Sequence, residues 1–457
     1  MNASPMPSTE RSPNWRPDSD HPDRQTESVN EPNTSLTGLW SWALYDWANS
    51  AYWTVIQMFI FPPYFTQEIA ADQESGSRLW GMTLGIAGLI IAIGAPLLGA
   101  VADQMGRRKP WIGLFTVLTI LSIGFLWFIE PSTNFLWPAM LLVGAGTITF
   151  ECASVFYNAM LPDLVPKSRV GRWSGWGWSA GYAGGLAGLL LAGLLFLMPE
   201  QLPFGLDRDQ GGHIRATALL VAAWYLLFAL PLFMFTPDVP ASGKGLKRAM
   251  KDGYAQLLDM IKEVRPYRGI VRFLIALMIY HNGLVALFAF GGIYAASVFG
   301  MSEGDIVTFG LALNVAALLG SAGFGWIDDR IGGKQTILWS LVGLALSMAA
   351  LLLVESRLLF WIFGLLLGIF VGPAQASSRS YLSRMAPASL CNQMFGLHAL
   401  AGKVSAFLGP LVVGVTIDWT GSHRLGMSTI VVFVVVGFLL MLKAPSDWKE
   451  ATGASTD

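Results

Sequence analysis

The sequence predicts an all-α membrane protein with twelve transmembrane helices arranged in two six-helix bundles. Of its 457 residues, 53% are apolar and only 13% are charged, about half of the roughly 25% charged share of soluble domains. Apolar runs of about 20 residues, enough to cross roughly 30 Å of hydrocarbon, recur along the chain. A distinctive turn also occurs twice, about half the chain apart. This composition excludes a soluble enzyme, a nucleic-acid-binding protein and a disordered protein.

The apolar runs are predicted to be helices, because the bilayer offers no partners for unpaired backbone groups. In the first predicted bundle, 37–236, the runs are Leu39–Phe61, Trp80–Val101, Trp111–Ile129, Phe135–Phe156, Trp176–Met198 and Ala216–Phe235. In the second, 269–443, they are Ile270–Val298, Ile306–Ile327, Gln335–Val354, Leu358–Pro373, Met394–Thr416 and Met427–Leu442. The tenth run is apolar only as far as Pro373, and we expect its polar continuation to be helical too.

The segments outside the bundles are polar. Residues 1–36 are rich in Pro, Ser, Asn and Asp, and they predict a disordered cytoplasmic tail. No short apolar segment with a cleavage site opens the chain, so the first membrane helix is expected to direct targeting. The linker 237–268 is basic, and Gly245–Ile261 predicts an amphipathic helix, which we interpret as lying on anionic lipid headgroups rather than forming a regulatory domain. Residues 444–457 form a second cytoplasmic tail.

The distribution of Lys and Arg sets the predicted orientation. Of the 29 such residues, three fall within predicted helices, Arg272, Arg379 and Lys403. Five fall in outer segments, Arg78, Arg208, Arg215, Arg357 and Arg424. The other 21 lie in inner segments when the N-terminus is inside. Because cytoplasmic loops carry the excess of positive charge, we predict a multi-pass protein of the cell membrane with both termini in the cytoplasm.

The repeated turn follows the second helix of each predicted bundle. Its first copy has Gly99, Asp103, Gly106 and Arg107, and its second has Gly325, Asp329 and Gly332, both in the pattern G-x-x-x-D-x-x-G followed by a cation. The glycines allow close packing and a tight turn. Each aspartate can accept hydrogen bonds from a neighbouring helix N-terminus or pair with an arginine. We predict that the two turns are conformational-switch loops.

These features resemble the major facilitator superfamily, and finer segments resemble its vacuole effluxer-like family, which includes a yeast autophagy-related vacuolar amino-acid exporter and many bacterial members. The resemblance spans about 37–443. Its most specific segments are Tyr45-Asp46-Trp47-Ala48-Asn49-Ser50-Ala51-Tyr52 and Gln375-Ala376-Ser377-Ser378-Arg379-Ser380, followed by Phe156–Pro162 and Phe407–Pro410. It implies two six-helix bundles related by an axis along the membrane normal. The family tends to carry Tyr-Asn-Asp-Gly in helix seven, whereas this chain has Tyr280-His281-Asn282-Gly283 and lacks the acid.

Polar residues in the predicted spans are the candidate functional residues, because ionisable groups in a membrane are costly. The implied fold lines its central cavity with helices one, four, seven and ten. The candidate substrate-binding residues are Asn49, Ser50, Tyr157, Asn158, Tyr280, Asn282 and Gln375, and the candidate coupling or gating residues are Asp46, Glu151, His281, Arg379 and Lys403. Trp47 and Trp53 are expected in an interfacial belt, with stacking on substrate as the alternative.

Several roles stay open at this point. Glu151 is the deepest acid and is expected to be protonated or to switch between states, which suits proton coupling; the alternative is a neutral acid that joins two helices by hydrogen bonds. An Asp46–Arg379 gate competes with an Arg379 that reaches the inner headgroups. Lys403 fits a structural ion pair as well as a substrate contact, and His281 fits simple packing.

Together these observations predict a secondary active transporter of a small polar solute, with an amino acid as candidate solute, efflux as candidate direction and protons as candidate coupling ion. A lipid flippase on the same fold and a non-transporting receptor or scaffold are the alternatives. The sequence has no Walker-type Gly-Lys-Ser/Thr loop, and no catalytic residues, metal site or cofactor are expected. We expect a monomer that contacts substrate and membrane lipids and does not bind nucleic acid.

Overall fold

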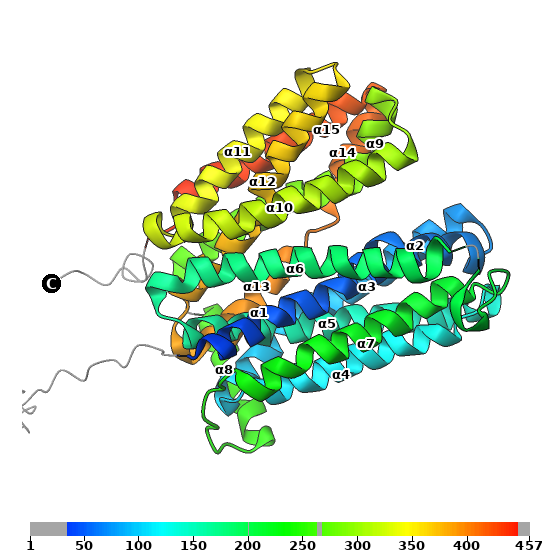
Figure 1. The fold of residues 1–457 in the computed structure, drawn as a ribbon. Coiled ribbons are helices and arrows are strands. Elements are labelled where there is room, and N and C mark those ends of the chain that lie inside the picture. The colour runs from blue at the N-terminus through cyan, green and yellow to red at the C-terminus, as the bar shows by residue number, and fades with distance from the viewer. Residues whose placement is uncertain (1–33, 200, 263–266, 447–457) are drawn as a thin grey trace, which may run out of the picture. The chain divides into compact units, whose positions relative to one another are not determined.

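The structure, a computed structural model, describes residues 34–199, 201–262 and 267–446. The predicted tails lie almost wholly outside this part of the chain. All regular structure in the described residues is helical (Figure 1). The helices are α1 (Leu36–Ala51), α2 (Phe61–Tyr64), α3 (Gln73–Met105), α4 (Lys109–Phe125), α5 (Leu136–Leu164), α6 (Val170–Ala192), α7 (Gly212–Phe235), α8 (Leu246–Lys262), α9 (Arg268–Phe299), α10 (Glu303–Ile331), α11 (Gly333–Leu353), α12 (Arg357–Met385), α13 (Cys391–Lys403), α14 (Leu408–Thr420) and α15 (His423–Leu442).

Eleven helical segments of the described chain are long and apolar enough to cross a membrane, from Gln73–Met105 to His423–Leu442. The predicted count of twelve is therefore not confirmed. The predicted span that is missing from these eleven is the first, Leu39–Phe61. In this segment α1 continues directly into a π-helix, Tyr52–Phe59. This segment is helical, but its Trp, Tyr, Asn and Ser residues dilute its apolar character. The helical continuation after Pro373 is confirmed, because α12 runs to Met385.

The eleventh predicted span, Met394–Thr416, is broken rather than continuous. Helix α13 ends at Lys403 and α14 begins at Leu408. The Asn282 side chain of α9 lies at this break: its Nδ2 donates to Ser405 Oγ at 2.8 Å, and its Oδ1 accepts the Gly409 N–H at 3.1 Å. Backbone groups freed in a membrane-spanning segment must find such partners, so a side chain from another helix makes the break possible.

The buried apolar residues form two clusters. One is built from residues between Leu39 and Leu232, and the other from residues between Ile270 and Ala444 together with Ile91, Ala95, Val155 and Ala159 of α3 and α5. The described helices thus have an N-terminal core and a C-terminal core. We refer to residues 34–235 as the N-half and to residues 267–446 as the C-half.

Helix α6 of the N-half packs closely against α1 of its own half and against α10 of the C-half. A Cβ atom on Gly184 would overlap the Trp47 carbonyl oxygen of α1, and one on Gly175 would overlap the Ser321 carbonyl oxygen of α10. Figure 1 shows α6 running between α1 and α10. Small residues allow helix backbones to approach this closely in membranes. Helix α6 is therefore the place where the N-half meets α10 of the C-half.

Candidate functional site

The first repeat loop binds the start of a helix in the other half. At the end of α3, the Asp103 carboxylate accepts the backbone N–H groups of Asn392 at 3.0 Å and Gln393 at 2.9 Å, and the Asn392 side-chain amide at 2.8 Å. These N–H groups belong to the first turn of α13, whose positive dipole end favours a carboxylate. A side chain on Gly99 would overlap the Asn392 carbonyl oxygen. The hydrogen bonds expected for Asp103 are present.

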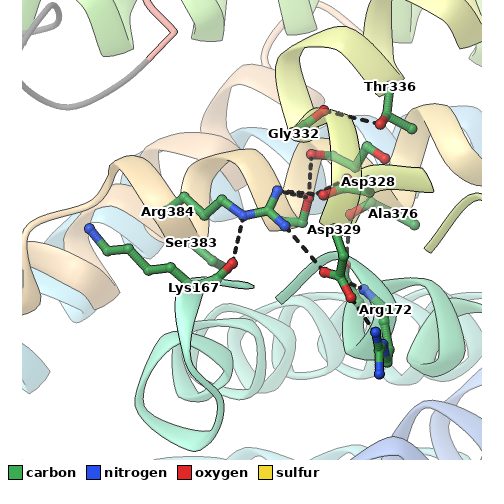
Figure 2. A network of polar contacts seen from close by, with 12 residues as sticks. Lys167, Arg172, Asp328, Asp329, Gly332, Thr336, Ala376, Ser383 and Arg384 are labelled. Atoms are coloured by element: carbon green, nitrogen blue, oxygen red, sulfur yellow. Dashed lines mark hydrogen bonds and ion pairs between the residues drawn. The ribbon is translucent and has the colours of Figure 1, made fainter. Parts of the chain in front are cut away.

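The second repeat loop makes the matching contact (Figure 2). Asp329 of α10 accepts the backbone N–H of Arg172 at 3.1 Å and its Nε at 3.0 Å, at the start of α6. Arg384 of α12 pairs with Asp328, lies 3.4 Å from an Asp329 oxygen and donates to the Lys167 carbonyl at 3.0 Å. Each repeat aspartate therefore holds a helix start in the opposite half.

The cation of the first loop that joins the halves is Arg108 rather than the predicted Arg107. Arg107 is exposed, whereas Arg108 is buried, pairs with Asp163 of α5 and donates to Asn392 Oδ1 at 3.1 Å. The sequence pattern requires only a cation after the second glycine, so it could not distinguish the two neighbours.

A second group of contacts surrounds Arg379 of α12. Its guanidinium group lies 3.0 Å from Asp46 Oδ2 of α1 and 3.1 Å from Asn158 Oδ1 of α5, and it donates to Ser174 Oγ at 2.9 Å on α6. The Ser174 hydroxyl in turn donates to the Ala376 carbonyl at 2.6 Å. We call these residues the Arg379 cluster. They bring three N-half helices onto one C-half side chain, as the proposed Asp46–Arg379 pair requires.

Aromatic rings complete the surroundings of Arg379. The guanidinium carbon lies 5.0 Å from the Trp42 ring centre and 5.9 Å from those of Tyr157 and Trp178. Only 4% of the Arg379 side chain is exposed. A guanidinium group keeps its charge in such a place when hydrogen bonds, an anion and ring faces together replace its hydration. Arg379 therefore does not reach the headgroups, which was the alternative role.

Glu151 and Lys403 form another ion pair that joins the halves. The Lys403 Nζ of α13 lies 2.6 Å from Glu151 Oε1 of α5 and 5.4 Å from the centre of the Trp53 ring. The two charged side chains are 23% and 16% exposed. Lys403 is the last residue of α13, directly before the break.

The other predicted polar residues divide between partly exposed and fully buried positions. The Tyr280 and Ser378 hydroxyl oxygens are hydrogen-bonded at 2.5 Å. The Asn282 side chain forms its hydrogen bonds with Ser405 and Gly409 at the break between α13 and α14. Asn49 and Tyr157 are also buried, while Ser50, Asn158, His281 and Gln375 are partly exposed. Tyr157 stacks on Trp42 at 4.8 Å.

Sequence reasoning missed several residues of these contacts. Ser174 carries no signal of its own in the sequence, and Arg384 is one of the 21 inner Lys and Arg residues that bear only on orientation. The acidic neighbour Asp328 was visible as part of an Asp-Asp pair, but its partners come from α12. Among the described residues, no three His, Cys, Asp or Glu side chains are grouped so that they could hold a metal ion.

Comparison with known proteins assigns the family. The family described as vacuole effluxer Atg22 like matches residues 77–451. The chain belongs to this family. The uncharacterised MFS-type transporter YxiO of Bacillus subtilis is 28% identical over 412 residues, which cover 89% of this chain and 94% of the relative. Autophagy-related protein 22 of Kluyveromyces lactis is 22% identical, over 73% of this chain and 72% of that protein.

Solved structures agree on the fold. The major facilitator superfamily transporter FucP, crystallised in the outward conformation, superposes with a TM-score of 0.70 at 14% identity, over 90% of this chain and 98% of FucP. Such low identity establishes the fold alone. The chain is therefore a multi-pass membrane transporter of the major facilitator superfamily, in the Atg22-like family.

Proposed function

We propose that this protein is a secondary active transporter that moves a small polar solute across the cell membrane by alternating access. In this proposal α1 and the π-helix after it, Leu36–Phe59, form a twelfth span, which completes six-helix bundles at 37–236 and 269–443. The excess of Lys and Arg in the inner segments supports cytoplasmic termini. The superfamily fold supports a central site that opens to one side of the membrane at a time.

The observation that carries the proposal is that two ion pairs outside the repeat loops, Asp46–Arg379 and Glu151–Lys403, run between the halves. An ion pair in a membrane protein is costly unless its partners stay together. Pairs that join two bodies able to rock apart must break and reform in each cycle. A scaffold would have no use for this arrangement, whereas a transporter can use the released charges to meet a solute or a proton.

The structure fits one end state of such a cycle. Both repeat loops, the Arg379 cluster and Gly175 of α6 hold the halves together through many short contacts. With the termini in the cytoplasm, these contacts lie on the cytoplasmic side of the molecule. We infer that this state is closed to the cytoplasm and that Asp103 and Asp329 act as its switch contacts.

The proposed solute is an amino acid and the proposed direction is efflux. The family description as an effluxer supports the direction, and the polar side chains from both halves support a small polar solute. The proposed contact residues are Asn49, Ser50, Tyr157, Asn158, Tyr280, Asn282 and Gln375. The partly exposed members Ser50, Asn158 and Gln375 would meet the solute first.

Proton coupling is proposed at Glu151. While Lys403 is 2.6 Å away, the carboxylate is matched by a cation. When the halves separate at this level, Glu151 loses that cation and becomes free to meet a proton. Proton uptake would thus be tied to the movement of the halves. The His281 ring of α9 lies beside Gly402, next to Lys403, and is the second candidate.

The test is transport by the purified protein in sealed vesicles with an imposed pH difference. A panel of radiolabelled amino acids, sugars and lipids distinguishes solute transport from lipid flipping. We expect saturable movement of an amino acid that depends on the pH difference. Movement of lipid but of no small solute would favour the flippase, and movement of neither would favour the scaffold.

A further inference from the structure

The linker helix α8 presents two different apolar faces. Ala249, Gly253 and Leu257 are buried, and α8 packs against α3. A Cβ atom on Gly253 would lie 2.8 Å from the Ala100 carbonyl oxygen of α3. Beside this buried face, an apolar stripe is left uncovered: Leu246, Met250 and Tyr254 are 51%, 54% and 56% exposed.

The charges on α8 and on the residues just before it are also of two kinds. Lys244 and Arg248 both lie near Asp252, at 3.1 Å and 3.8 Å, so the protein itself balances them. Lys247 and Lys251 are exposed and make no ion pair with any described residue. They follow Leu246 and Met250 directly and therefore border the exposed apolar stripe. An apolar stripe edged by unbalanced lysines is the surface of a helix that lies in the membrane interface.

The position of α8 along α3 fits this surface. It contacts α3 at Ala100 and at Gln104, whose side chain bonds Gln256. Further up the same helix, Ile86, Leu89, Ile90 and Ile93 are exposed apolar residues. The stripe on α8 therefore continues the apolar outer surface of α3 at the end of the membrane span, just before the basic residues that begin at Arg107.

The chain before α8 is fastened to the first repeat loop. The Asp238 carboxylate accepts the N–H groups of Arg108 at 3.0 Å and Lys109 at 3.1 Å, which caps α4. Ser242 binds the carbonyls of Gln104 and Met105 at the end of α3. Among the described residues the second repeat loop has no such cover, because nothing lies within 4 Å of a Cβ built on Gly332, whereas Pro240 lies against Gly106.

We propose that the stripe Leu246, Met250 and Tyr254, with Lys247 and Lys251, docks on the anionic inner leaflet of the membrane, and that this docking holds the linker over the first repeat loop. The occupant is lipid rather than protein because the stripe is continuous with the lipid-facing surface of α3. The unbalanced lysines select anionic headgroups. The first repeat loop thereby senses lipid charge, and the second does not.

The experiment uses the full chain in vesicles of phosphatidylcholine with or without phosphatidylglycerol. A cysteine that replaces Met250, Tyr254 or Ala255 carries an environment-sensitive fluorophore, and brominated lipids serve as quenchers. Cys152 and Cys391 are buried, and the chain without an added cysteine is the labelling control.

The third position is the matched control for the other two. Ala255 is exposed, and it follows Lys251 by one turn and Arg248 by two turns, so it lies on the polar side of α8. Quenching is expected at Met250 and Tyr254 but not at Ala255. Equal quenching at all three, or none at the first two, would overturn the docking.

The charge requirement has a matched pair of variants. Lys247→Gln with Lys251→Gln should lower quenching at Met250 in anionic vesicles, since removing two charges weakens surface association roughly tenfold or more. Lys244→Gln with Arg248→Gln removes the same charge from the balanced positions and should have little effect. Equal effects of the two doubles would contradict the proposal.

The link to the loop has its own readout, which does not depend on transport. Hydrogen exchange at the Arg108 and Lys109 amides, which Asp238 caps, should be slower in anionic than in neutral vesicles. The Lys247→Gln, Lys251→Gln double should remove this difference. Exchange that is unaffected by lipid charge while docking is seen would refute the link between α8 and the loop.

Discussion

Two of the ion pairs that join the halves, Asp46–Arg379 and Glu151–Lys403, differ in how many partners hold them. Arg379 meets Asp46, Asn158, Ser174 and three aromatic rings, and its side chain is almost fully buried. Lys403 has Glu151 and one ring, Trp53, and both charges are partly exposed. The difference suggests separate tasks. A charge with many fixed partners stabilises one state, while a charge with one partner can change partner or proton during a cycle.

The largest effect is expected at the cluster with the most partners. Arg379→Met leaves Asp46 without its cation and Ser174 and Asn158 without their donor. Removing one member of a buried pair costs on the order of 3 kcal/mol, so we expect a clearly lower unfolding temperature in detergent and no measurable transport. Arg272→Met is the matched control, because Arg272 is exposed on α9. Similar results for both variants would show that the Arg379 cluster does not stabilise this state.

A smaller effect is expected at the repeat loops. Asp103→Asn keeps the size of the side chain but weakens the charge-assisted bonds to Asn392 and Gln393, each of which contributes about 1.5–3 kcal/mol. Transport should slow roughly tenfold, while solute binding, measured by calorimetry on the purified protein, should persist. If Asp103→Asn transports at the normal rate, the loop is not a switch contact.

The smallest effects are expected at the proposed contact residues. Asn158→Ala and Gln375→Ala each remove one polar group, so binding should weaken about fivefold to tenfold. Gln375→Ala should change stability little, whereas Asn158→Ala also removes a hydrogen-bond acceptor from Arg379 and should lower stability. Asn49→Ala, at another proposed contact residue, should weaken binding and also lower stability, because Asn49 is buried. Unchanged affinity in both Asn158→Ala and Gln375→Ala would place the solute elsewhere.

Much of the fold and part of the site could be predicted from the sequence. Apolar runs indicate spans because hydrocarbon thickness sets their length, and the repeated Gly and Asp turn indicates its helix-start contacts because the chemistry is local. The break after Lys403 could not be predicted, since it depends on Asn282 from a helix more than a hundred residues away. Ser174 was missed for the same reason: its role comes from Arg379, which only the tertiary fold brings near.

The ionisable residues inside the helices could likewise be recognised from the sequence, but not all of their partners could. Asp46 and Arg379 could be paired from their expected depth on neighbouring lining helices. Glu151 could be recognised as a deep acid in need of a cation, and Lys403 as a deep cation. The contact between Glu151 and Lys403 at 2.6 Å depends on how α5 and α13 pack together. This packing between the halves cannot be predicted from residue spacing in the sequence.

The central claim is that the ion pair with fewer partners, Glu151–Lys403, couples protons to transport. Glu151→Gln tests this claim most directly. Glutamine keeps the shape of the neutral acid but cannot titrate. In sealed vesicles with an imposed pH difference, the variant should still exchange labelled solute for unlabelled solute across the membrane. It should no longer accumulate solute against a gradient. Accumulation at the wild-type level would show that Glu151 is structural and would contradict the account.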